Sequence, residues 1–450
     1  MALSDIEKAG KARFQIDTSK QRSTEKAVVI VPVLRQRGDN AAGLNQRTDA
    51  SRLEEAVGLA RAIDLEIVHS GIVPVAKPKP GTLLGTGKVD EFAGLIAALD
   101  AGLVIVDHPL TPVQQRNLEK AWKAKVLDRT GLILEIFGAR AQTKEGRLQV
   151  ELAHLNYQRG RLVRSWTHLE RQRGGSGFLG GPGETQIESD RRQLQERINK
   201  LERELEKVRR TRTLHRSQRR KIPHPVVALV GYTNAGKSTL FNHLTGSTVM
   251  AKDMLFATLD PTLRQLNLPQ GTRAILSDTV GFVSDLPTHL VAAFRATLEE
   301  VIEAELIIHV RDIADPDTQA QAEDVYAILS QLGIDKQGRA NVMEVWNKID
   351  LLDEAALESI RATRNGEDAA LLISAQSGQG TDALLELIEA RIAGSDNVME
   401  FQLPLSAMGQ LTWIYDNTHV IERSDEEDGS LRMKVRASPE IKTALKARLT

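Results

Sequence analysis

A glycine-rich loop that ends in lysine and serine is the strongest chemical signal in the chain. The segment Gly231–Ser238 reads GYTNAGKS, between an apolar run, Val226–Val230, and a helix-forming stretch, TLFNHLTG. This is the G-x-x-x-x-G-K-[ST] pattern in the strand–loop–helix context of a phosphate-binding loop, where backbone N–H groups face an anion at a helix N-terminus. We therefore expect Lys237 to reach the β and γ phosphates of a nucleotide and Ser238 to place its hydroxyl on Mg²⁺. The alternative is a tight turn without a ligand.

A D-x-x-G motif follows the loop at a distance that suits the same site. The stretch AILSDTVG, Ala274–Gly281, reads as a strand that ends in this motif. Asp278 would hold Mg²⁺ through a water molecule, and the Gly281 amide would meet the γ-phosphate. The motif is too common to mean much alone, so its weight comes from its order after the phosphate loop.

A third motif, N-K-x-D, indicates which base is bound. It ends the buried-strand pattern Asn341–Asp350. The Asp350 carboxylate can accept two hydrogen bonds from N1–H and the 2-amino group of guanine, a pair that adenine cannot offer. A site built around a buried carboxylate rejects the wrong base because the charge would go unpaired. Asn347 would bind the O6/N7 edge and support the phosphate loop, the Lys348 stem would pack on the ring, and the Ala375 amide would point at O6.

The ordered set resembles the GTPase domain of translation-factor-related proteins over residues 226–393. FATLDPT, Phe256–Thr262, resembles the switch I segment of the Era/Obg/HflX branch. Two longer stretches, Asp128–Leu155 and His168–Arg192, resemble stretches particular to the HflX family, and the likeness covers the chain from about Lys26. The resemblance implies a cytoplasmic, Mg²⁺-dependent GTPase that associates with the large (50S) ribosomal subunit and acts in protein synthesis, ribosome splitting or rescue, or ribosome biogenesis.

The resemblance also implies the residues that bind the nucleotide. Thr258 is the expected switch I ligand of Mg²⁺, with Thr262 as the competing candidate, and a hydroxyl that binds the metal only with a γ-phosphate present makes an order–disorder switch. The expected nucleotide contacts, grouped by motif, are Gly231, Tyr232, Thr233, Asn234, Ala235, Gly236, Lys237 and Ser238; Phe256, Ala257, Thr258, Leu259 and Asp260; Asp278, Thr279, Val280 and Gly281; and Asn347, Lys348, Ile349, Asp350, Ser374, Ala375 and Gln376.

The residue after D-x-x-G departs from GTPases that orient water with a glutamine there. The Phe282 side chain can neither donate nor accept a hydrogen bond, so it cannot orient a water molecule. The alternative is that Phe282 has only a packing role. Either way we expect a low intrinsic rate, stimulated in trans by a docked partner, because positioning the water is much of this chemistry. Asn234 resembles the asparagine that helps bind K⁺ in some relatives, so K⁺ is a possible cofactor. The expected catalytic groups are Lys237, Thr258, Gly281 and Asn234.

The elements that must position these motifs follow from length and periodicity. A chain of 450 residues suggests about three domains, and strands alternate with helices in two regions, so the fold class is multidomain α/β. The expected order is a flexible tail at 1–25, a small α/β domain at 26–143, a basic antiparallel helical hairpin at 144–222, a GTP-binding domain at 223–394 and a small C-terminal α/β domain at 395–450. In the last we expect strands near Met399–Leu405 and Leu431–Val435 and a final helix.

The hairpin is predicted from two heptad patterns around a glycine-rich turn. Leucine and other apolar residues recur every three, four or seven positions from Leu148 to Leu169 and from Ile187 to Val208. Between them, Gly174–Gly183 holds six glycines and a proline in ten residues, so we expect a non-helical tip loop.

The hairpin region is also basic. Residues 144–222 carry 20 Lys and Arg against 10 Asp and Glu in a chain whose net charge is −1. We expect contact with ribosomal RNA through arginines and two apolar residues at the tip, while the alternative is a coiled-coil turn with solvated charge. The expected contact residues are Arg171, Arg173, Phe178, Leu179, Arg191 and Arg192.

Composition excludes several classes of protein, and other functions stay open as alternatives. Without cysteine the chain has no disulfide, Cys-ligated zinc site or thiol nucleophile, and its apolar runs are too short to span a bilayer, so we expect a cytoplasmic monomer. GTLLGTGK, Gly81–Lys88, could bind ATP in an RNA-remodelling enzyme, but its spacing fails the phosphate-loop pattern and favours a turn into a helix. The second rival is a GTPase switch for a protein partner without RNA.

Overall fold

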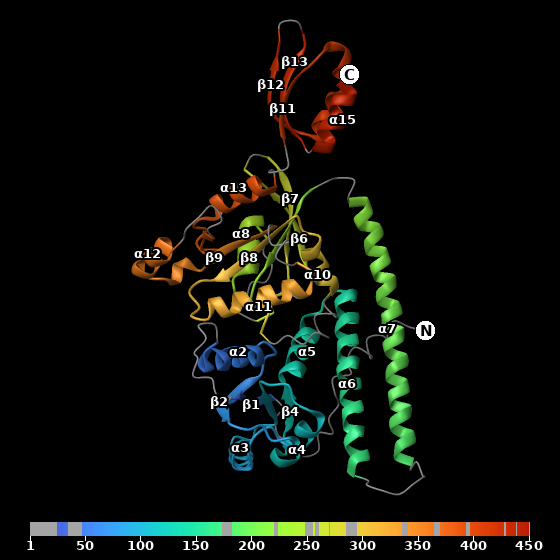
Figure 1. The fold of residues 1–450 in the computed structure, drawn as a ribbon, viewed down its shortest axis with the longest axis vertical. Coiled ribbons are helices and arrows are strands. Elements are labelled where there is room, and N and C mark those ends of the chain that lie inside the picture. Colours follow the sequence, from blue (N-terminus) through green and yellow to red (C-terminus); the bar gives the residue numbers. More distant parts are fainter. Residues whose placement is uncertain are drawn as a thin grey trace. The chain divides into compact units, whose positions relative to one another are not determined.

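The computed structural model describes most of the chain. The described residues are 25–34, 47–172, 182–219, 224–247, 255–256, 261–269, 271–284, 295–334, 341–363, 370–392, 397–426, 429–437 and 439–449. The chain forms two compact units, one mainly of residues up to Val208 and one mainly from Arg209 onward. Among the described helices, none combines the length and apolar character that crossing a membrane requires. The multidomain α/β fold class is confirmed (Figure 1).

The first unit begins with a four-stranded sheet whose paired strands all run parallel, in the order β2-β1-β3-β4. Strand β1 is buried almost along its whole length, as expected for a parallel strand with both faces covered. The elements are β1 (Lys26–Leu34), α2 (Asp49–Arg61), β2 (Glu66–Val75), α3 (Thr86–Ala98), β3 (Leu103–Val106), α4 (Pro112–Trp122), β4 (Lys125–Asp128) and α5 (Arg129–Arg140).

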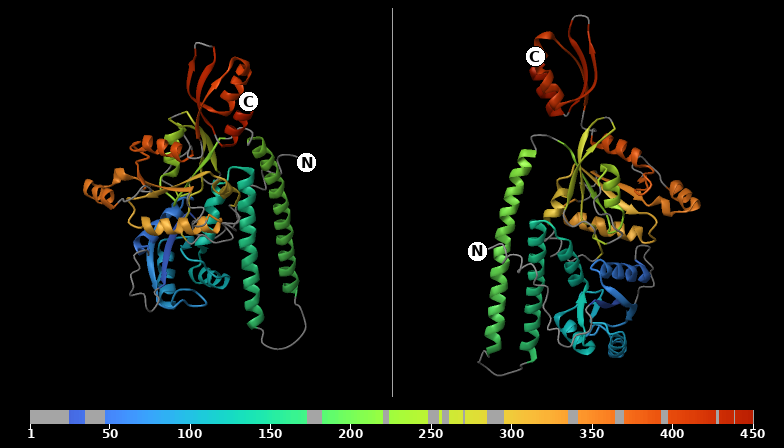
Figure 2. Two further views of the ribbon diagram at one scale, coloured as in Figure 1. Left: turned by 45° about the horizontal axis from the view of Figure 1, so that its top comes forward. Right: turned by 180° about the vertical axis from the view of Figure 1, so that it is seen from behind.

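Two long helices follow, α6 (Lys144–Gln172) and α7 (Pro182–Arg219), and they lie side by side in both views (Figures 1 and 2). The predicted heptad seam packs where its side chains are described: Leu148 and Leu155 of α6 are buried with Ile198 of α7. The predicted tip loop is wrong at its end, because α7 begins at Pro182; proline is tolerated in the first turn, where its missing N–H has no partner to lose. Residues 173–181 lie outside the described residues.

The second unit contains a six-stranded sheet in the order β10-β9-β8-β5-β7-β6, parallel except for β6. The strands are β5 (Val226–Val230), β6 (Thr262–Asn267), β7 (Arg273–Asp278), β8 (Leu306–Asp312), β9 (Val342–Asn347) and β10 (Leu371–Leu372). The helices are α8 (Lys237–Thr245), α10 (Arg295–Ile302), α11 (Thr318–Gln331), α12 (Glu354–Thr363), α13 (Thr381–Ile392) and the 3-10 turn η2 (Ile349–Leu351). The order of the strands along the sheet reverses beside β5. The loops at such a reversal usually form the ligand crevice of an open α/β sheet.

The C-terminal residues form a separate antiparallel sheet in the order β11-β13-β12 over a small apolar core that includes Met433 and Leu445. Its elements are β11 (Asn397–Leu403), η4 (Leu405–Gln410), α14 (Leu411–Asn417), β12 (His419–Asp425), β13 (Leu431–Ala437) and α15 (Pro439–Leu449). The prediction found β11, β13 and α15 but missed β12, whose mostly polar and exposed residues lack the apolar alternation of a half-buried strand.

Candidate functional site

The phosphate-loop sequence forms a tight turn between β5 and α8, and two of its glycines are required by close approach. A Cβ on Gly231 would lie 2.2 Å from the carbonyl oxygen of Val310, and a Cβ on Gly236 would lie 2.2 Å from Nδ2 of Asn347. Gly236 also has φ +91°, a conformation that favours glycine. The helix begins at the next residue, Lys237, so the loop ends at a helix N-terminus, where an anion is stabilised.

Lys237 is buried and folded back on this loop. Its Nζ donates to the carbonyl oxygens of Gly231, at 3.1 Å, and Tyr232, at 2.7 Å. Burial lowers the pKa of Lys237 to about 8, although the Asp278 carboxylate acts in the opposite direction. Neutral carbonyls leave the charge without an ionic partner in direct contact, so a phosphate can take their place and restore the charged form.

Ser238 and Asp278 meet beside the loop in the way a Mg²⁺ site needs. The Ser238 hydroxyl donates to Oδ2 of Asp278 at 2.7 Å. Mg²⁺ takes oxygen ligands, keeps several waters and binds through one or two protein groups plus phosphates. A hydroxyl and a carboxylate on adjacent elements fit that pattern. Over the described residues, no group of three or more His, Asp or Glu could hold a metal by itself, so phosphate oxygens would have to complete the site.

The D-x-x-G segment lies against the phosphate loop. The Phe282 amide donates to the Gly231 carbonyl at 3.1 Å, and the Thr233 amide donates to the Phe282 carbonyl at 2.7 Å. A Cβ on Gly281 would lie 3.0 Å from both Nζ of Lys237 and Cα of Thr233. The Phe282 side chain is only 1% exposed, so it packs in the interior and cannot orient a water molecule.

Asn347 joins the phosphate loop to the expected base-binding loop. Its Nδ2 donates to the Ala235 carbonyl, and its Oδ1 accepts from the Ala375 amide, both at 2.9 Å. The expected support of the phosphate loop is thus visible in the geometry. The side chain is buried, and its oxygen is already engaged before any base binds.

The rest of the N-K-x-D motif faces outward. Lys348 has φ +66°, and its Nζ pairs with Asp312 at 2.7 Å, which fixes the stem. Asp350 is exposed, whereas the sequence argument assumed a buried carboxylate; a bound purine would have to cover it. In the loop after β10, Ser374 and Ala375 are buried and Gln376 is exposed.

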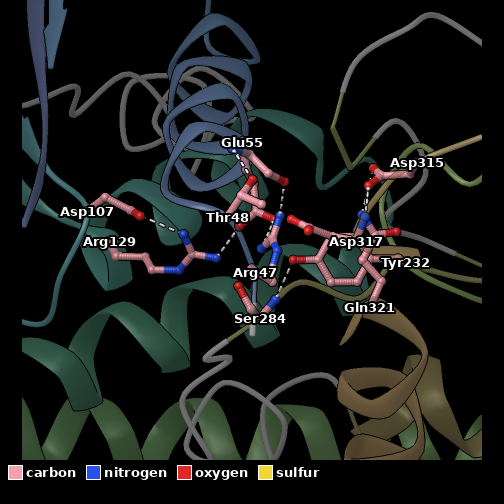
Figure 3. Close-up of polar contacts among 11 residues, drawn as sticks. Arg47, Thr48, Glu55, Asp107, Arg129, Tyr232, Ser284, Asp315, Asp317 and Gln321 are labelled. Atoms are coloured by element: carbon pink, nitrogen blue, oxygen red, sulfur yellow. Dashed lines mark hydrogen bonds and ion pairs between the residues drawn. The ribbon is translucent and has the colours of Figure 1, made fainter. Parts of the chain in front are cut away.

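One side chain at the site, His243, escaped the sequence analysis, and so did one contact of the expected nucleotide-binding residue Tyr232. His243 of α8 supports the loop after β10, because a Cβ on Gly378 would lie 2.7 Å from its Cε1, and its Nε2 is 3.4 Å from the Thr381 hydroxyl. The Tyr232 hydroxyl accepts a hydrogen bond from the Ser284 amide at 2.8 Å (Figure 3). Neither could be found from spacing, since each pair joins positions more than fifty residues apart.

Several expected site residues are outside the described part of the chain or engaged elsewhere. Thr258, with its neighbours in 257–260, lies outside the described residues, as do Arg173, Phe178 and Leu179. Phe256 is buried, and its ring meets Phe137 edge to face at 4.7 Å between centroids. The remaining expected residues are placed as follows: Thr262 begins β6, Arg171 belongs to α6, Arg191 and Arg192 are exposed on α7, Asn234 is exposed, Thr279 and Val280 are buried, and Ile349 is buried in η2.

The GTLLGTGK segment forms a turn into α3 rather than a phosphate loop. Gly85 caps the helix, which begins at Thr86. Lys88 is exposed and pairs with Glu91 on the same helix at 2.6 Å. The lysine therefore points at a carboxylate and not at an anion-binding turn.

Comparisons with known proteins agree along the chain. Family models match as GTP-binding GTPase N-terminal (residues 50–138), GTP-binding GTPase Middle Region (140–219), 50S ribosome-binding GTPase (226–348) and HflX C-terminal domain (359–450). A GTPase HflX of Magnetococcus marinus is 49% identical, covering 84% of this chain and 86% of its own, and one of Escherichia coli is 44% identical, covering 87% and 91%. A Sulfolobus solfataricus GTP-binding protein crystallised with GDP is 22% identical, covers 82% of this chain and 99% of its own, and has a TM-score of 0.43. The chain therefore belongs to the HflX family, a family of 50S ribosome-binding GTPases, and is itself a GTPase.

Proposed function

We propose that the protein is a Mg²⁺-dependent GTPase whose GTP-bound form docks on the large ribosomal subunit in the cytoplasm and acts in ribosome splitting or rescue. The observation that carries the nucleotide part is the convergence of Lys237, the Ser238–Asp278 pair and Gly281 at one loop. A Mg²⁺–triphosphate requires four kinds of group: a carboxylate, a hydroxyl, an ammonium and a glycine amide.

Each group has a role in the proposed reaction. Lys237 would exchange the loop carbonyls for the β and γ phosphates, and Ser238 and Asp278 would hold Mg²⁺, Ser238 through its hydroxyl and Asp278 through water. Mg²⁺, when bound, would neutralise charge that develops on the phosphates. Thr258 is the proposed switch I residue that would add its hydroxyl to the metal site when the γ-phosphate is present. Because Phe282 cannot orient the attacking water, turnover is slow until the docked ribosome supplies a group that can.

The ribosome part of the proposal is supported by the family match and by the charge of the hairpin. Arg191 and Arg192 are exposed on α7, near the end that leads to the glycine-rich tip. Arginine suits phosphate and base-stacking contacts. GTP favours the docked state to the extent that the GTP form binds the subunit more tightly than the GDP form, and hydrolysis favours release.

Sedimentation with ribosomal subunits tests this proposal. The full chain is layered on sucrose gradients with purified large subunits and GTP, a non-hydrolysable GTP analogue, GDP or ATP. We expect co-sedimentation with the analogue and little with GDP or ATP, and none for Lys237→Ala, which cannot hold the triphosphate. A protein that stays at the top of every gradient has no ribosome role. Calorimetry that finds ATP bound as tightly as GTP would remove the guanine assignment.

Salt dependence separates RNA contact from a protein partner. Replacing Arg191 and Arg192 with alanine should weaken subunit binding and reduce the slope of log affinity against log salt by about 1 to 2, because each phosphate contact contributes about 0.7 to 0.9. Binding that is insensitive to salt would favour the rival switch for a protein partner.

The K⁺ proposal concerns Asn234, which is exposed in the phosphate loop with φ +61°. An amide oxygen there can coordinate a monovalent cation beside the phosphates. We expect faster subunit-stimulated turnover in K⁺ than in Na⁺ buffer and loss of that difference in Asn234→Ala. Equal rates in the two salts would rule the role out.

A further inference from the structure

Three hydrogen bonds join the phosphate loop to the segment after D-x-x-G, and the third comes from a side chain. Two are backbone bonds between Phe282 and the loop residues Gly231 and Thr233. In the third, the Tyr232 hydroxyl accepts from the amide of Ser284 at 2.8 Å (Figure 3). Tyr232 is 4% exposed, so its ring is held by its surroundings and the hydroxyl has a defined position.

This bond extends the connection two residues beyond the backbone pairing. The isolated bridge between Tyr232 and Phe282 ends the parallel pairing that continues from β5 and β7. The amide at position 284 lies beyond that bridge along the chain. The phenol supplies an acceptor at that point, so the segment stays on the loop through Ser284.

The held segment includes the residue that must recognise the γ-phosphate. Gly281 lies so close to the loop that an added Cβ would be 3.0 Å from Nζ of Lys237. The Lys237 ammonium and Gly281 are therefore close neighbours in the structure. A γ-phosphate needs both groups, whereas a diphosphate needs the loop and Lys237 but not Gly281.

We propose that Tyr232 is a positioning residue that favours GTP over GDP by tying the D-x-x-G segment to the phosphate loop through Ser284. The inference rests on the proposed γ-phosphate role of Gly281. Preorganised donors do not have to be ordered when the ligand arrives, so the tie lowers the cost of engaging the γ-phosphate and leaves the contacts of the α and β phosphates unchanged.

Tyr232→Phe removes the hydroxyl and keeps the ring, the loop backbone and both backbone bonds. One neutral hydrogen bond corresponds to about a three- to tenfold change in affinity. We expect the full-length variant to bind a fluorescent non-hydrolysable GTP analogue three to ten times more weakly, with GDP affinity unchanged. Amide exchange at Ser284 should be faster in the variant. The matched control is Tyr415→Phe, which loses a phenol hydroxyl that bonds Arg423 in the C-terminal domain and should change neither affinity.

Ser284→Pro breaks the same bond from the other side, since proline has no N–H to donate. It should show the same loss of preference for the GTP analogue, and the double variant should lose little more than either single change. Equal weakening of GDP and analogue, or no weakening of either, overturns the role of Tyr232. A wild-type protein that binds neither nucleotide overturns the proposed function itself, so the two failures are distinct.

Discussion

The four-stranded and six-stranded sheets differ in the groups that follow the carboxyl ends of their parallel strands. In the sheet of the second unit, β5 ends in a glycine loop whose cation, Lys237, bonds to neutral carbonyls among the described residues. In the sheet of the first unit, the residues after β3 and β4 form a closed cluster in which Arg129 donates to Asp107 and to Glu55 of α2, each at 2.5 Å (Figure 3). Both carboxyl ends lie at a strand-order reversal of the kind that often marks a ligand crevice, and they differ in the partners of their buried cations.

In the first unit, the buried charged groups that follow β3 and β4 pair with one another and with Glu55 of α2. Arg129 is 5% exposed; burial opposes its charge, but the Asp107 and Glu55 carboxylates outweigh that effect and raise the pKa of its guanidinium. Glu55 also pairs with Arg47 at 2.6 Å, so two cations and two carboxylates balance one another. A cation held by carboxylates is hard to recruit for phosphate, whereas one held by carbonyls is not. The position in the sheet is therefore insufficient to define a ligand site; the partners of the buried cations decide it.

The largest expected difference is between alanine substitutions of the lysines in the two glycine-containing segments, Gly231–Ser238 and Gly81–Lys88. Lys237→Ala should lower GTP turnover by about 100-fold or more, because a preorganised cation at the phosphates contributes several kcal/mol. Lys88→Ala, the matched change in GTLLGTGK, removes only an exposed pair with Glu91 and should leave GTP turnover unchanged. Single-turnover hydrolysis on both variants measures this. A comparable loss in Lys88→Ala would mean that the first edge also binds nucleotide.

The next effect concerns the stability of the closed cluster. Arg129→Met leaves two buried carboxylates without their shared cation, and breaking a buried pair from one side costs about 3 to 5 kcal/mol. Urea unfolding followed by hydrogen exchange in the first unit should show that loss. The control is Arg197→Met, whose exposed pair with Glu151 contributes about 0 to 1 kcal/mol. A small effect of Arg129→Met would show that the cluster relaxes or admits water, and would reopen it as a ligand site.

The same contrast shows which features a sequence can reveal. The phosphate loop, β5 and the ends of β7 and β9 were predictable, because each depends on spacing within about ten residues. The Arg129–Glu55 pair joins positions 74 apart, and the Tyr232–Ser284 bond joins positions 52 apart. Neither partner carries a local pattern, since an arginine after a strand reads the same whether it faces a carboxylate or solvent. Pro182 shows the opposite error. The glycine-rich composition favoured a loop at this position, but α7 begins there.

A buried histidine in the second unit tests what burial does to a titratable group that shares its nearest carboxylate with an arginine. His309 on β8 is 4.0 Å from Glu344, which also pairs with Arg311 at 2.9 Å. Burial lowers the pKa of His309 to about 4, and Arg311 adds to that, while Glu344 acts against it. The folded state then binds this proton less readily than the unfolded state, so stability falls as the pH drops from about 6.5 towards 4, by at most about 3 kcal/mol.

His309→Gln should remove that part of the pH dependence. The difference between the urea midpoints at pH 7 and pH 4.5 should be smaller in the variant than in the wild type. Carboxylates elsewhere titrate equally in both proteins, so the difference between the two isolates His309. An unchanged pH dependence would indicate that folding does not shift the pKa of His309.

The smallest expected effect comes from removing the hydroxyl of Tyr157, and we compare it with the same change at Tyr232. Tyr157 of α6 donates its hydroxyl to Oδ1 of Asp128 at 2.6 Å. Burial raises the pKa of Asp128, whereas the Arg161 charge and the amides of Gly131 and Leu110 act in the opposite direction because they favour the ionised carboxylate. Tyr157→Phe should cost about 1 to 2 kcal/mol of stability in the first unit and leave GTP and GDP affinity unchanged. Tyr232→Phe should change the preference for GTP with little effect on stability. If Tyr232→Phe, like Tyr157→Phe, changed stability and left the preference for GTP unchanged, the Tyr232 hydroxyl would have a structural role like that of Tyr157.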